Sequence, residues 1–388
     1  MAETASAEPL AVYIHWPFCL SKCPYCDFNS HVRENIDVDR WRAGFLAEID
    51  HYATETTGRR VSSIFFGGGT PSLMPPDLAG DLIERINTLW GLGPDCEVIL
   101  EANPTSAEAA NFHALAQAGV NRLSVGVQAL NDPDLAFLGR QHSHREALAA
   151  IDAAQSAVDR VSFDLIYARP GQTAQTWEEE LKTALSIGTE HLSLYQLTIE
   201  RGTSFFAAYR GGHFSLPDED LAAALFDLTN DICAGHGLPA YEISNHARPG
   251  AESRHNLTYW RGGDYAGIGP GAHGRLTIDD VCYATEQITG PENWLAAVEQ
   301  DGHGTRRREA LTRDIRIEEI IMTGLRLAQG LERRRFEALA GCELEQVFEA
   351  RTLRPLLAHG LLTLDEAGLR ATGEGRLKLN AVLAALLG

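Results

Sequence analysis

The chain has no long hydrophobic run and no excess of positive charge. No stretch of its 388 residues approaches the roughly 18 uninterrupted apolar residues that a membrane span needs. The first ten residues carry two glutamates and lack the basic segment of a secretory signal. Lys and Arg number 33 against 53 Asp and Glu, and the formal net charge of −20 opposes attraction to nucleic acid and anionic lipid. We therefore expect a cytoplasmic protein with no membrane span and no nucleic-acid partner.

Cysteine is scarce and odd in number. Seven unevenly spaced cysteines do not make a disulfide scaffold. Three of them crowd together as Cys19, Cys23 and Cys26. The other four stand alone, and we expect them to be small buried core residues: Cys96, Cys233, Cys282 and Cys342.

Short β-rich runs alternate with amphipathic stretches between residues 11 and 198. Strands are expected at residues 11–15, 62–66, 97–100, 122–127, 161–166 and 191–197, and helices at 39–52, 76–89, 107–118, 145–157 and 176–187. This alternation implies parallel strands joined by right-handed crossovers. Six repeats, with polar or glycine-rich residues just after several strands, favour an α/β fold built as a partial (β/α)6 barrel. A doubly wound open sheet is the alternative.

The chain divides into four expected regions. They are an N-terminal tail (1–10), the barrel core (11–200), a barrel extension with glycine-rich ligand-contacting loops (201–300), and a C-terminal unit (301–388). The last region shows helices, a two-strand hairpin and a closing helix, which is typical of a winged-helix-like domain. Its 14 Lys and Arg nearly balance 13 Asp and Glu, so we expect a packing or partner-contact role rather than DNA binding.

The three clustered cysteines have C-x3-C-x2-C spacing directly after the first expected strand. Three thiolates on one short loop can each bind a separate iron of a 4Fe-4S cluster and leave the fourth iron open. The amino and carboxylate groups of S-adenosylmethionine (SAM) can chelate that iron, and one electron can then cleave the sulfonium bond to give a 5′-deoxyadenosyl radical. Structural zinc, with His15 or His31 as the fourth ligand, is the alternative.

Several ordered motifs resemble one known family. The segment YIHWPFC at residues 13–19, followed by CPYCDF, resembles the radical SAM group that contains oxygen-independent coproporphyrinogen III oxidase and the HemW haem chaperones. The similarity runs from about Val12 to the C-terminus. Supporting motifs are FGGGTPS (66–72), EANP (101–104), RLSVGVQ (122–128), LGRQH (138–142), FDLIY (163–167), YEISN (241–245), HNLTYW (255–260) and GIGPGAH (267–273).

The resemblance implies a set of SAM-binding residues. The glycine run after the second strand would meet the amino end of SAM, and several polar or tyrosine side chains would line its pocket. The implied residues are Tyr13, Tyr25, Gly68, Gly69, Thr70, Glu101, Gln128, Arg140 and Asp164, beside the cluster ligands Cys19, Cys23 and Cys26. Without the resemblance, the glycines also fit a tight turn, Arg140 and Asp164 fit an ion pair, and a strand tyrosine fits the core.

Two features separate the branches of this group. The oxidases carry a further cysteine two places after the third ligand, where this chain has Phe28. The HNLTYW motif also resembles the chaperone branch: a neutral His255 suits axial ligation of haem iron, and Tyr259 and Trp260 could stack on the macrocycle. A hydrogen bond from His255 to its own loop is the alternative, and His142, His246 and His273 are further candidate ligands.

One segment departs from the family pattern. After FDLIY the family continues Gly-Leu-Pro-Gly, whereas this chain has Ala168 and Arg169 before Pro170 and Gly171. Alanine matters if the backbone needs a positive φ, and the arginine adds a charge near the expected pocket.

The sequence therefore favours a radical SAM 4Fe-4S protein that carries haem as cargo to recipient haemoproteins. It would draw on an electron donor such as a flavodoxin-like protein, and an oligomer is compatible with the sequence. The alternatives are an oxygen-independent coproporphyrinogen III oxidase, against which Phe28 argues, and a zinc-stabilised interaction protein. The sequence does not decide whether the protein is an enzyme.

Overall fold

The computed structural model describes residues 9–348 and 350–388. In these residues one curved sheet of 11 strands follows the order β13-β12-β11-β10-β1-β4-β5-β6-β7-β8-β9. Most of the N-terminal tail expected over residues 1–10 lies outside the described residues, and Leu10 already begins the first strand.

Six strands at the centre of this sheet run parallel, as the sequence predicts. They are β1 (Leu10–Trp16), β4 (Val61–Gly68), β5 (Leu92–Ala102), β6 (Arg122–Gln128), β7 (Arg160–Tyr167) and β8 (His191–Gln196). Successive residues such as Leu192 and Ser193 are both buried, so each strand is covered on both faces. Strands of this kind read in sequence as short continuous apolar runs, which explains why they could be located.

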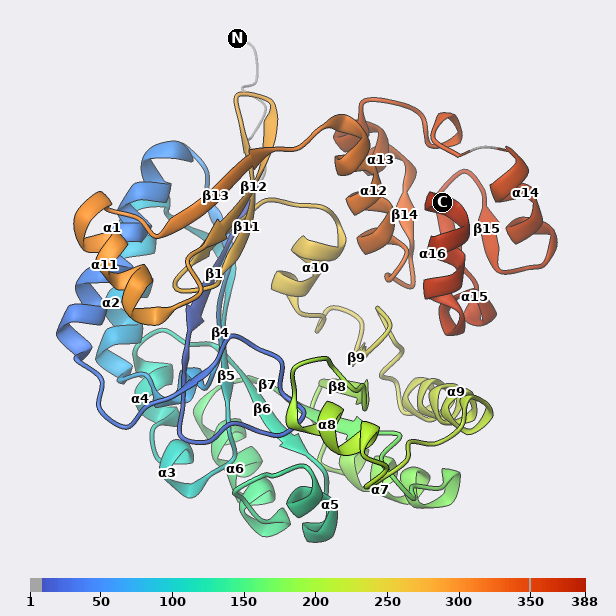
Figure 1. Cartoon of the computed structure of the whole chain (residues 1–388), viewed down its shortest axis with the longest axis horizontal. Helices are drawn as coiled ribbons and strands as arrows, with labels where there is room; N and C mark the ends of the chain where they lie inside the picture. The colour runs from blue at the N-terminus through green and yellow to red at the C-terminus, as the bar shows by residue number, and fades with distance from the viewer. Residues whose placement is uncertain (1–8, 349) are drawn as a thin grey trace.

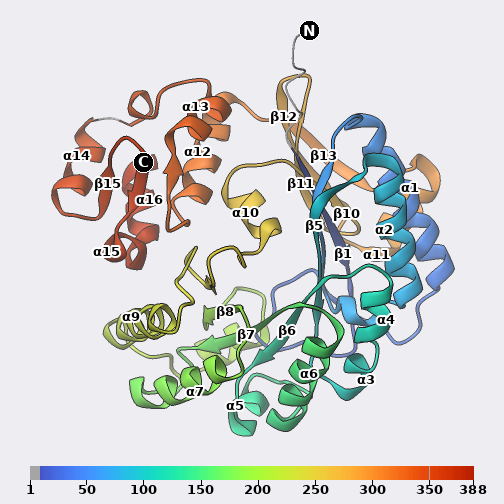
Figure 2. The same ribbon diagram turned by 180° about the vertical axis from the view of Figure 1, so that it is seen from behind.

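The helices that connect these strands all lie on the convex outer side of the sheet (Figures 1 and 2). They are α1 (Val38–Glu55), α2 (Pro76–Trp90), α3 (Ser106–Ala109), α4 (Phe112–Gln117), α5 (Asp132–Phe137), α6 (His144–Ala157) and α7 (Ala174–Ser186). A doubly wound sheet has helices on both faces, so the arrangement is a partial barrel. The single helix expected over 107–118 is instead α3 and α4, because the Glu108 carboxylate turns back to accept from the Asn103 N–H (3.1 Å).

Residues 201–310 are more regular than the sequence suggested, because they extend the sheet at both edges. β9 (Asn245–Ala247) pairs antiparallel with β8, and β10 (Tyr265–Ile268) pairs parallel with β1. The remaining elements are β11 (His273–Ile278), β12 (Val281–Gln287), β13 (Thr305–Ala310), α8 (Ser204–Arg210), α9 (Glu219–Gly235), α10 (Arg254–Trp260) and α11 (Pro291–Asp301). In both views α10 lies on the concave side of the sheet.

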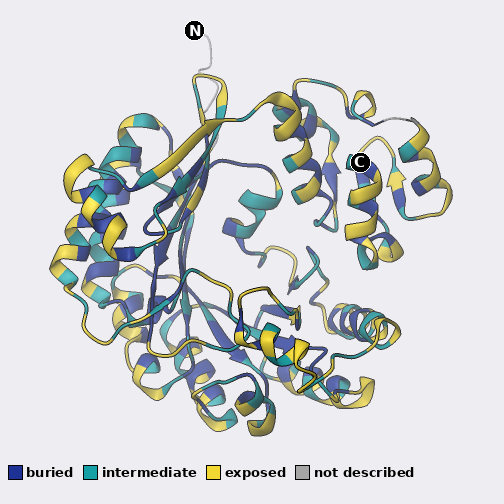
Figure 3. Ribbon diagram, viewed as in Figure 1, coloured by how far each residue is buried: buried dark blue, intermediate teal, exposed yellow. Residues whose placement is uncertain are grey.

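The C-terminal unit has a small sheet, β14-β16-β15, and a hydrophobic core of its own around Phe336, Leu369 and Val382. Figure 3 shows this second buried interior apart from that of the barrel. Its elements are α12 (Arg313–Gly324), β14 (Leu331–Glu332), α13 (Arg333–Ala340), the 3-10 turn η2 (Leu344–Gln346), α14 (Ala350–Ala358), β15 (Leu362–Leu364), β16 (Gly368–Ala371), α15 (Gly373–Leu377) and α16 (Leu379–Leu387). Helices followed by the β15–β16 hairpin make a winged-helix-like arrangement.

The segment before β9 joins the two cores. The Arg376 guanidinium donates to the Glu242 carbonyl oxygen (2.8 Å), and the Ala328 N–H donates to that of Tyr241 (2.9 Å). Ile243 packs against the C-terminal core. The C-terminal unit is therefore held opposite the strand ends of the barrel.

Two smaller expectations can be compared with the described residues. None of their helices combines the length and apolar character that crossing a membrane requires. Of the four isolated cysteines, Cys233 is buried as expected, whereas Cys96, Cys282 and Cys342 are half-buried.

Candidate functional site

The loop that carries the three clustered cysteines is fixed against the end of β4. It begins at β2 (Phe18–Cys19), which pairs with β3 (His31–Val32). The Thr70 N–H donates to the Phe18 carbonyl oxygen (2.8 Å), just before the 3-10 turn η1 (Pro71–Leu73). A Cβ atom on Gly69 would lie 2.7 Å from that same oxygen, so only glycine permits this approach. The glycine run therefore brings the cysteine loop and the strand end together.

The three cysteines line one small cavity of about 140 Å³. The Thr70 hydroxyl donates to the Cys19 sulfur (3.3 Å), and the Arg140 guanidinium donates to the Cys23 sulfur (3.3 Å). Donors of this kind stabilise thiolates that bind iron. Three thiols on one wall, two of them already supplied with donors, fit a 4Fe-4S cluster.

The histidines proposed for a zinc site have other partners. The His15 ring lies between the Tyr13 hydroxyl and the Asn29 carbonyl oxygen (2.9 Å each), and the His31 Nε2 lies 3.2 Å from the Asn29 side-chain oxygen. Across residues 9–348 and 350–388, no three His, Cys, Asp or Glu side chains are grouped so as to hold one metal ion, which is the arrangement that structural zinc needs.

Two carboxyl groups, on the strands that flank β6, complete the cavity wall. Glu101 on β5 and Asp164 on β7 both line it, and neither forms a salt bridge within the described part of the chain. Burial, together with the charge of Asp164, raises the pKa of Glu101 to about 8. Burial raises the pKa of Asp164 to about 6, although the Ser124 hydroxyl donates to it (3.4 Å). Two half-buried acids that form no salt bridge with the described residues form a site that favours a positively charged ligand.

Gln128 and Arg140 surround the same space. Gln128 has φ of 74° at an irregularity in the pairing of β6 with β7, a costly backbone conformation for a residue with a side chain. Strain at a cavity wall is typical of a functional position. Arg140 donates to the Asn103 side-chain oxygen (2.5 Å) and the Gly126 carbonyl oxygen (2.9 Å), and forms no salt bridge with Asp164. The guanidinium thus braces the cysteine loop against β5 and β6.

One of the residues expected to contact SAM, Tyr13, lies outside the cavity. Tyr25 lines the cavity, as do Gly68, Gly69 and Thr70. Tyr13 does not belong to its wall, because its ring is packed in the barrel interior against Phe65 (6.1 Å between ring centroids) and its hydroxyl bonds to His15. Tyr13 therefore acts as a core residue in this structure.

The segment that departs from the family pattern does not put a charge into the cavity. Ala168 does adopt a positive φ of 56°. Arg169, however, is 1% exposed and its guanidinium pairs with Asp134 (2.9 Å) and Glu180, on α5 and α7. The expectation of an added charge near the pocket is wrong, because this arginine turns into the helical layer.

His255 is not presented to a ligand. It is fully buried on α10, with its ring stacked on Phe65 (4.9 Å). Its Nδ1 lies 2.9 Å from the Ser63 hydroxyl, and its Nε2 is hydrogen-bonded to the Tyr259 hydroxyl. Burial lowers its pKa to about 3, so the ring is neutral. Both ring nitrogens are hydrogen-bonded in this structure, and axial ligation of haem iron by His255 stays a prediction.

The other candidate haem ligands also lie away from the cavity. His142 is buried and its Nε2 bonds to the Val127 carbonyl oxygen (3.0 Å). His246 is 1% exposed on β9, and His273 is exposed on β11. None of the three belongs to the described cavity walls around the cysteine loop.

A larger cavity of about 1000 Å³ continues from the small one toward the C-terminal unit. The two share Tyr25, Cys26, Phe28, Glu101, Gln128 and Asp164. The far wall comes from residues that sequence reasoning missed: Arg326, Arg376, Lys378 and Leu379. Their one sequence signal is the contrast between an acidic barrel and a nearly neutral C-terminal region.

A partial parallel barrel with three cysteines at its open end and acidic side chains at the strand ends defines a protein of the radical SAM class. Residues 13–184 match the radical SAM superfamily, and residues 311–377 match the HemN C-terminal domain. The chain belongs to the HemW-type radical SAM proteins, as its relatives show. It is 34% identical to "Heme chaperone HemW" of Bacillus subtilis (97% of this chain, 99% of the relative) and 35% identical to that of Escherichia coli (97% of each).

Two further comparisons concern compartment and fold. The chain is 41% identical to "Radical S-adenosyl methionine domain-containing protein 1, mitochondrial" of Mus musculus, over 99% of this chain and 88% of that relative. Its fold matches the solved structure of coproporphyrinogen III oxidase (HemN) from Escherichia coli with a TM-score of 0.81 and 24% identity, over 97% of this chain and 89% of that one. Membership of the radical SAM family implies that a 4Fe-4S cluster and SAM bind here.

Proposed function

We propose that this protein is a haem chaperone, which binds haem and delivers it to recipient haemoproteins. The observation that carries the proposal is the 1000 Å³ cavity between the barrel mouth and the C-terminal unit, next to the cysteine loop. Its size lies at the upper end of the range for small-molecule and cofactor sites, and apolar side chains such as Ile166, Leu197 and Phe226 line it. A broad apolar cavity suits a flat macrocycle. The similarity to proteins named heme chaperones over nearly the whole chain supports the same function.

The cysteine loop supplies the cluster site in this proposal. Cys19, Cys23 and Cys26 would hold a 4Fe-4S cluster, and Thr70 and Arg140 would donate to their sulfurs. The cluster supplies an open iron and one electron when bound.

The cavity wall supplies the SAM site. Glu101 and Asp164 would face the positive sulfonium and amino groups, and Gln128 and Tyr25 would close the sides. The backbone at Gly68 and Gly69 would lie against the amino end of the ligand.

Cluster loading is tested by iron and sulfide analysis after anaerobic reconstitution. The variant with all three loop cysteines changed to serine should lose its visible absorbance and its iron. Cys342→Ser, a half-buried cysteine of the C-terminal unit, is the matched control and should retain both. A triple variant that keeps its full iron load would contradict the cluster assignment.

Haem binding and transfer are tested on the reconstituted protein. Titration with haem should give saturable binding, and the haem should pass to an apo-haemoprotein added afterwards. Absence of saturable binding refutes the chaperone proposal. Incubation with coproporphyrinogen III, SAM and a reductant is run in parallel, because vinyl product would instead favour the oxidase.

We also propose a flavodoxin-like or similar electron donor and a cytoplasmic location for this chain. The cluster needs a one-electron source, and the lack of a membrane-length apolar run in the sequence motivates the compartment. The relatives from Mus musculus and other eukaryotes are named mitochondrial. Fractionation of the source cells tests the location, and recovery of the protein in an organelle would contradict it.

A further inference from the structure

The large cavity has walls of opposite charge. Acidic residues gather on the barrel side, namely Asp27, Glu101, Asp164, Glu200, Glu219 and Asp220. The C-terminal unit contributes three cations: Arg326 just after α12, Arg376 on α15, and Lys378 between α15 and α16. Apolar side chains, including Leu194 and Ile243, lie between the two walls. A ligand that is apolar in the middle and anionic at one edge matches this distribution.

The two arginines share a single buried counter-charge. Glu242 is fully buried, and its carboxylate lies 3.3 Å from the Arg326 guanidinium. Arg376 donates to the carbonyl oxygen of Glu242 (2.8 Å). The Nε atoms of both arginines are buried and have no hydrogen-bond partner among the residues that the structure describes. Burial also lowers the pKa of the Arg376 guanidinium, and the negative charge of Glu242 partly offsets this lowering. A second anion in the cavity would therefore relieve two incompletely compensated cations.

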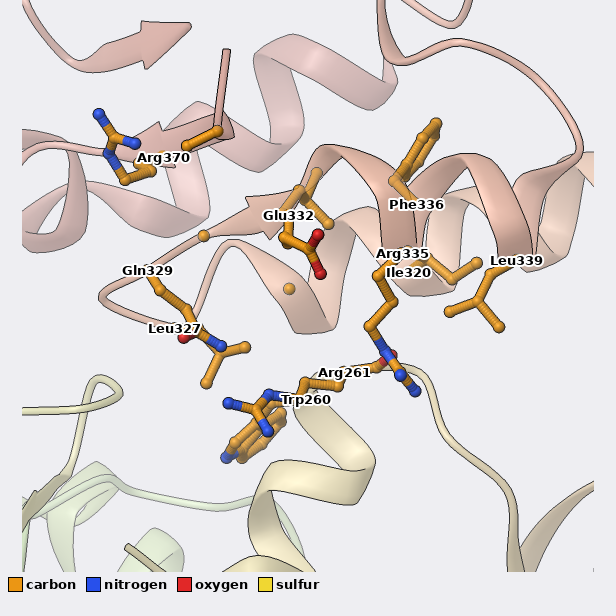
Figure 4. A pocket seen from close by; sticks show the side chains of 14 residues that line it. Trp260, Arg261, Ile320, Leu327, Gln329, Glu332, Arg335, Phe336, Leu339 and Arg370 are labelled. Atoms are coloured by element: carbon orange, nitrogen blue, oxygen red, sulfur yellow. The ribbon is translucent and has the colours of Figure 1, made fainter. Parts of the chain in front are cut away.

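The motif at residues 255–260 leads to one of these arginines. The Arg326 guanidinium carbon lies 4.6 Å from the centre of the Trp260 ring, at the end of α10. The start of α10 is fixed to β4 through the Ser63–His255 hydrogen bond. Figure 4 shows Trp260 and Arg261 at the end of α10, facing the loop with Leu327 and Gln329 across a second cavity of about 490 Å³. The helix α10 thus connects the barrel, through His255 at its start, to Arg326, through Trp260 at its end.

We propose that Arg326, Arg376 and Lys378 bind the two propionate carboxylates of haem in the large cavity, and that Trp260 positions Arg326 for this contact. The proposal rests on the chaperone function. Guanidinium groups bind carboxylates through paired, charge-assisted hydrogen bonds. The acidic barrel wall repels the propionates, so the cargo enters with its carboxylate edge toward the C-terminal unit. The opposite wall is then left for the cationic SAM.

This assignment gives two residues of the HNLTYW motif roles besides the predicted iron ligation. Its histidine anchors the helix, and its tryptophan stacks on the arginine that contacts the cargo. Trp260 is a positioning residue, because it would act through Arg326 and not on haem iron.

Haem and its dimethyl ester are the probes that test the carboxylate contacts. The ester keeps the macrocycle and iron but loses both negative charges. Wild-type protein should bind haem about tenfold to a hundredfold more tightly than the ester, as expected for charge-assisted hydrogen bonds. Equal binding of the two probes overturns this inference but leaves the chaperone function intact. Failure to bind either probe refutes the chaperone function itself.

Two variants should reduce this preference for haem. Lys378→Ala removes an exposed cation, and Arg326→Gln removes one of the two arginines while Glu242 stays in place as the counter-charge of Arg376. Lys182→Ala is the control, because Lys182 forms the same i,i+4 pair on the outer helix α7 that Lys378 forms with Glu374. The haem-to-ester ratio should fall several-fold in the first two and stay at the wild-type value in the control. An unchanged ratio in both test variants contradicts the assignment.

Trp260 is tested by a conservative pair of substitutions. Trp260→Leu should lower the haem-to-ester ratio, whereas Trp260→Phe keeps a ring over Arg326 and should restore it. A purely structural role would weaken both probes equally and leave the ratio unchanged. That result would refute the positioning role.

Discussion

The affinity for SAM should rise steeply with pH, and Glu101 is the reason. Its carboxyl group has no salt-bridge partner among the described residues, and desolvation together with the charge of Asp164 raises its pKa to about 8. A cationic ligand binds the ionised form of this group, so the proton must leave before or during binding. SAM binding should therefore release a proton, and it should be weakest in acid.

The size of the effect follows from the pKa. At pH 6 about one Glu101 carboxyl group in a hundred is ionised, and above pH 9 nearly all are. If binding requires the ionised form, the apparent affinity at pH 6 is about a hundredfold below its alkaline plateau. In the protein without SAM, the raised pKa of Glu101 also affects the stability of the fold. The stabilisation is fully present below the ordinary carboxyl pKa and is lost as the pH rises through about 8.

The assay is anaerobic calorimetry of SAM binding to cluster-loaded protein between pH 6 and pH 9, in buffers of different ionisation enthalpy. Glu101→Gln mimics the protonated form, so its affinity should match the wild type near pH 6 and fall below it above pH 7. Titration of the amino group of SAM contributes to both curves and cancels in the comparison, whereas Asp164, with a pKa of about 6, should ionise fully in both proteins above pH 7. Coincident curves over the whole range would refute this reasoning.

Three further substitutions test the backbone and packing around the site. Ala168→Gly should stabilise the protein by about 0.5–1 kcal/mol, because it removes the cost of a left-handed alanine; a lower thermal midpoint would contradict this. Arg169→Met should destabilise it by about 3–5 kcal/mol in denaturant unfolding, since Glu180 loses its buried partner. SAM affinity of the folded variant should not change, and a weaker affinity would place Arg169 in the pocket after all. Gly69→Ala should lower the iron content after reconstitution, because its Cβ would collide with the Phe18 backbone; full iron loading would show that the loop can adjust.

The strands and the strand-end residues were predictable because their signals are local. Buried parallel strands appear as apolar runs, and the ends of such strands meet at one edge of a sheet. That rule brings Glu101 and Gln128 to the same mouth, and the family resemblance adds Asp164; in the structure all three line one cavity. The three-cysteine loop was predictable for the same reason, since its spacing lies within eight residues.

The side chains that sequence reasoning placed least well are those whose partners are distant in sequence. Arg169 follows a strand end, yet its partners Asp134 and Glu180 lie on outer helices. His255 is bonded to Ser63, which lies 192 residues earlier. A sequence pattern assigns a residue to a strand or a helix but does not reveal which face meets another element. For a histidine, the face on which it lies determines whether its ring bonds to another element or is open to a bound molecule.

The C-terminal wall of the cavity depends on tertiary docking in the same way. No motif marks Arg326 or Arg376, and their surroundings follow from the contact of α12 and α15 with the segment around Glu242. The nearly neutral total charge of the C-terminal region does not reveal this basic wall. Basic side chains of the region line the cavity, whereas its described acidic side chains do not. Docking that unit over an acidic barrel mouth creates a gradient of potential across one continuous cavity. An anionic cargo and a cationic cofactor can then occupy opposite ends, each beside the wall that attracts it, and their opposite charges favour joint occupancy over competition.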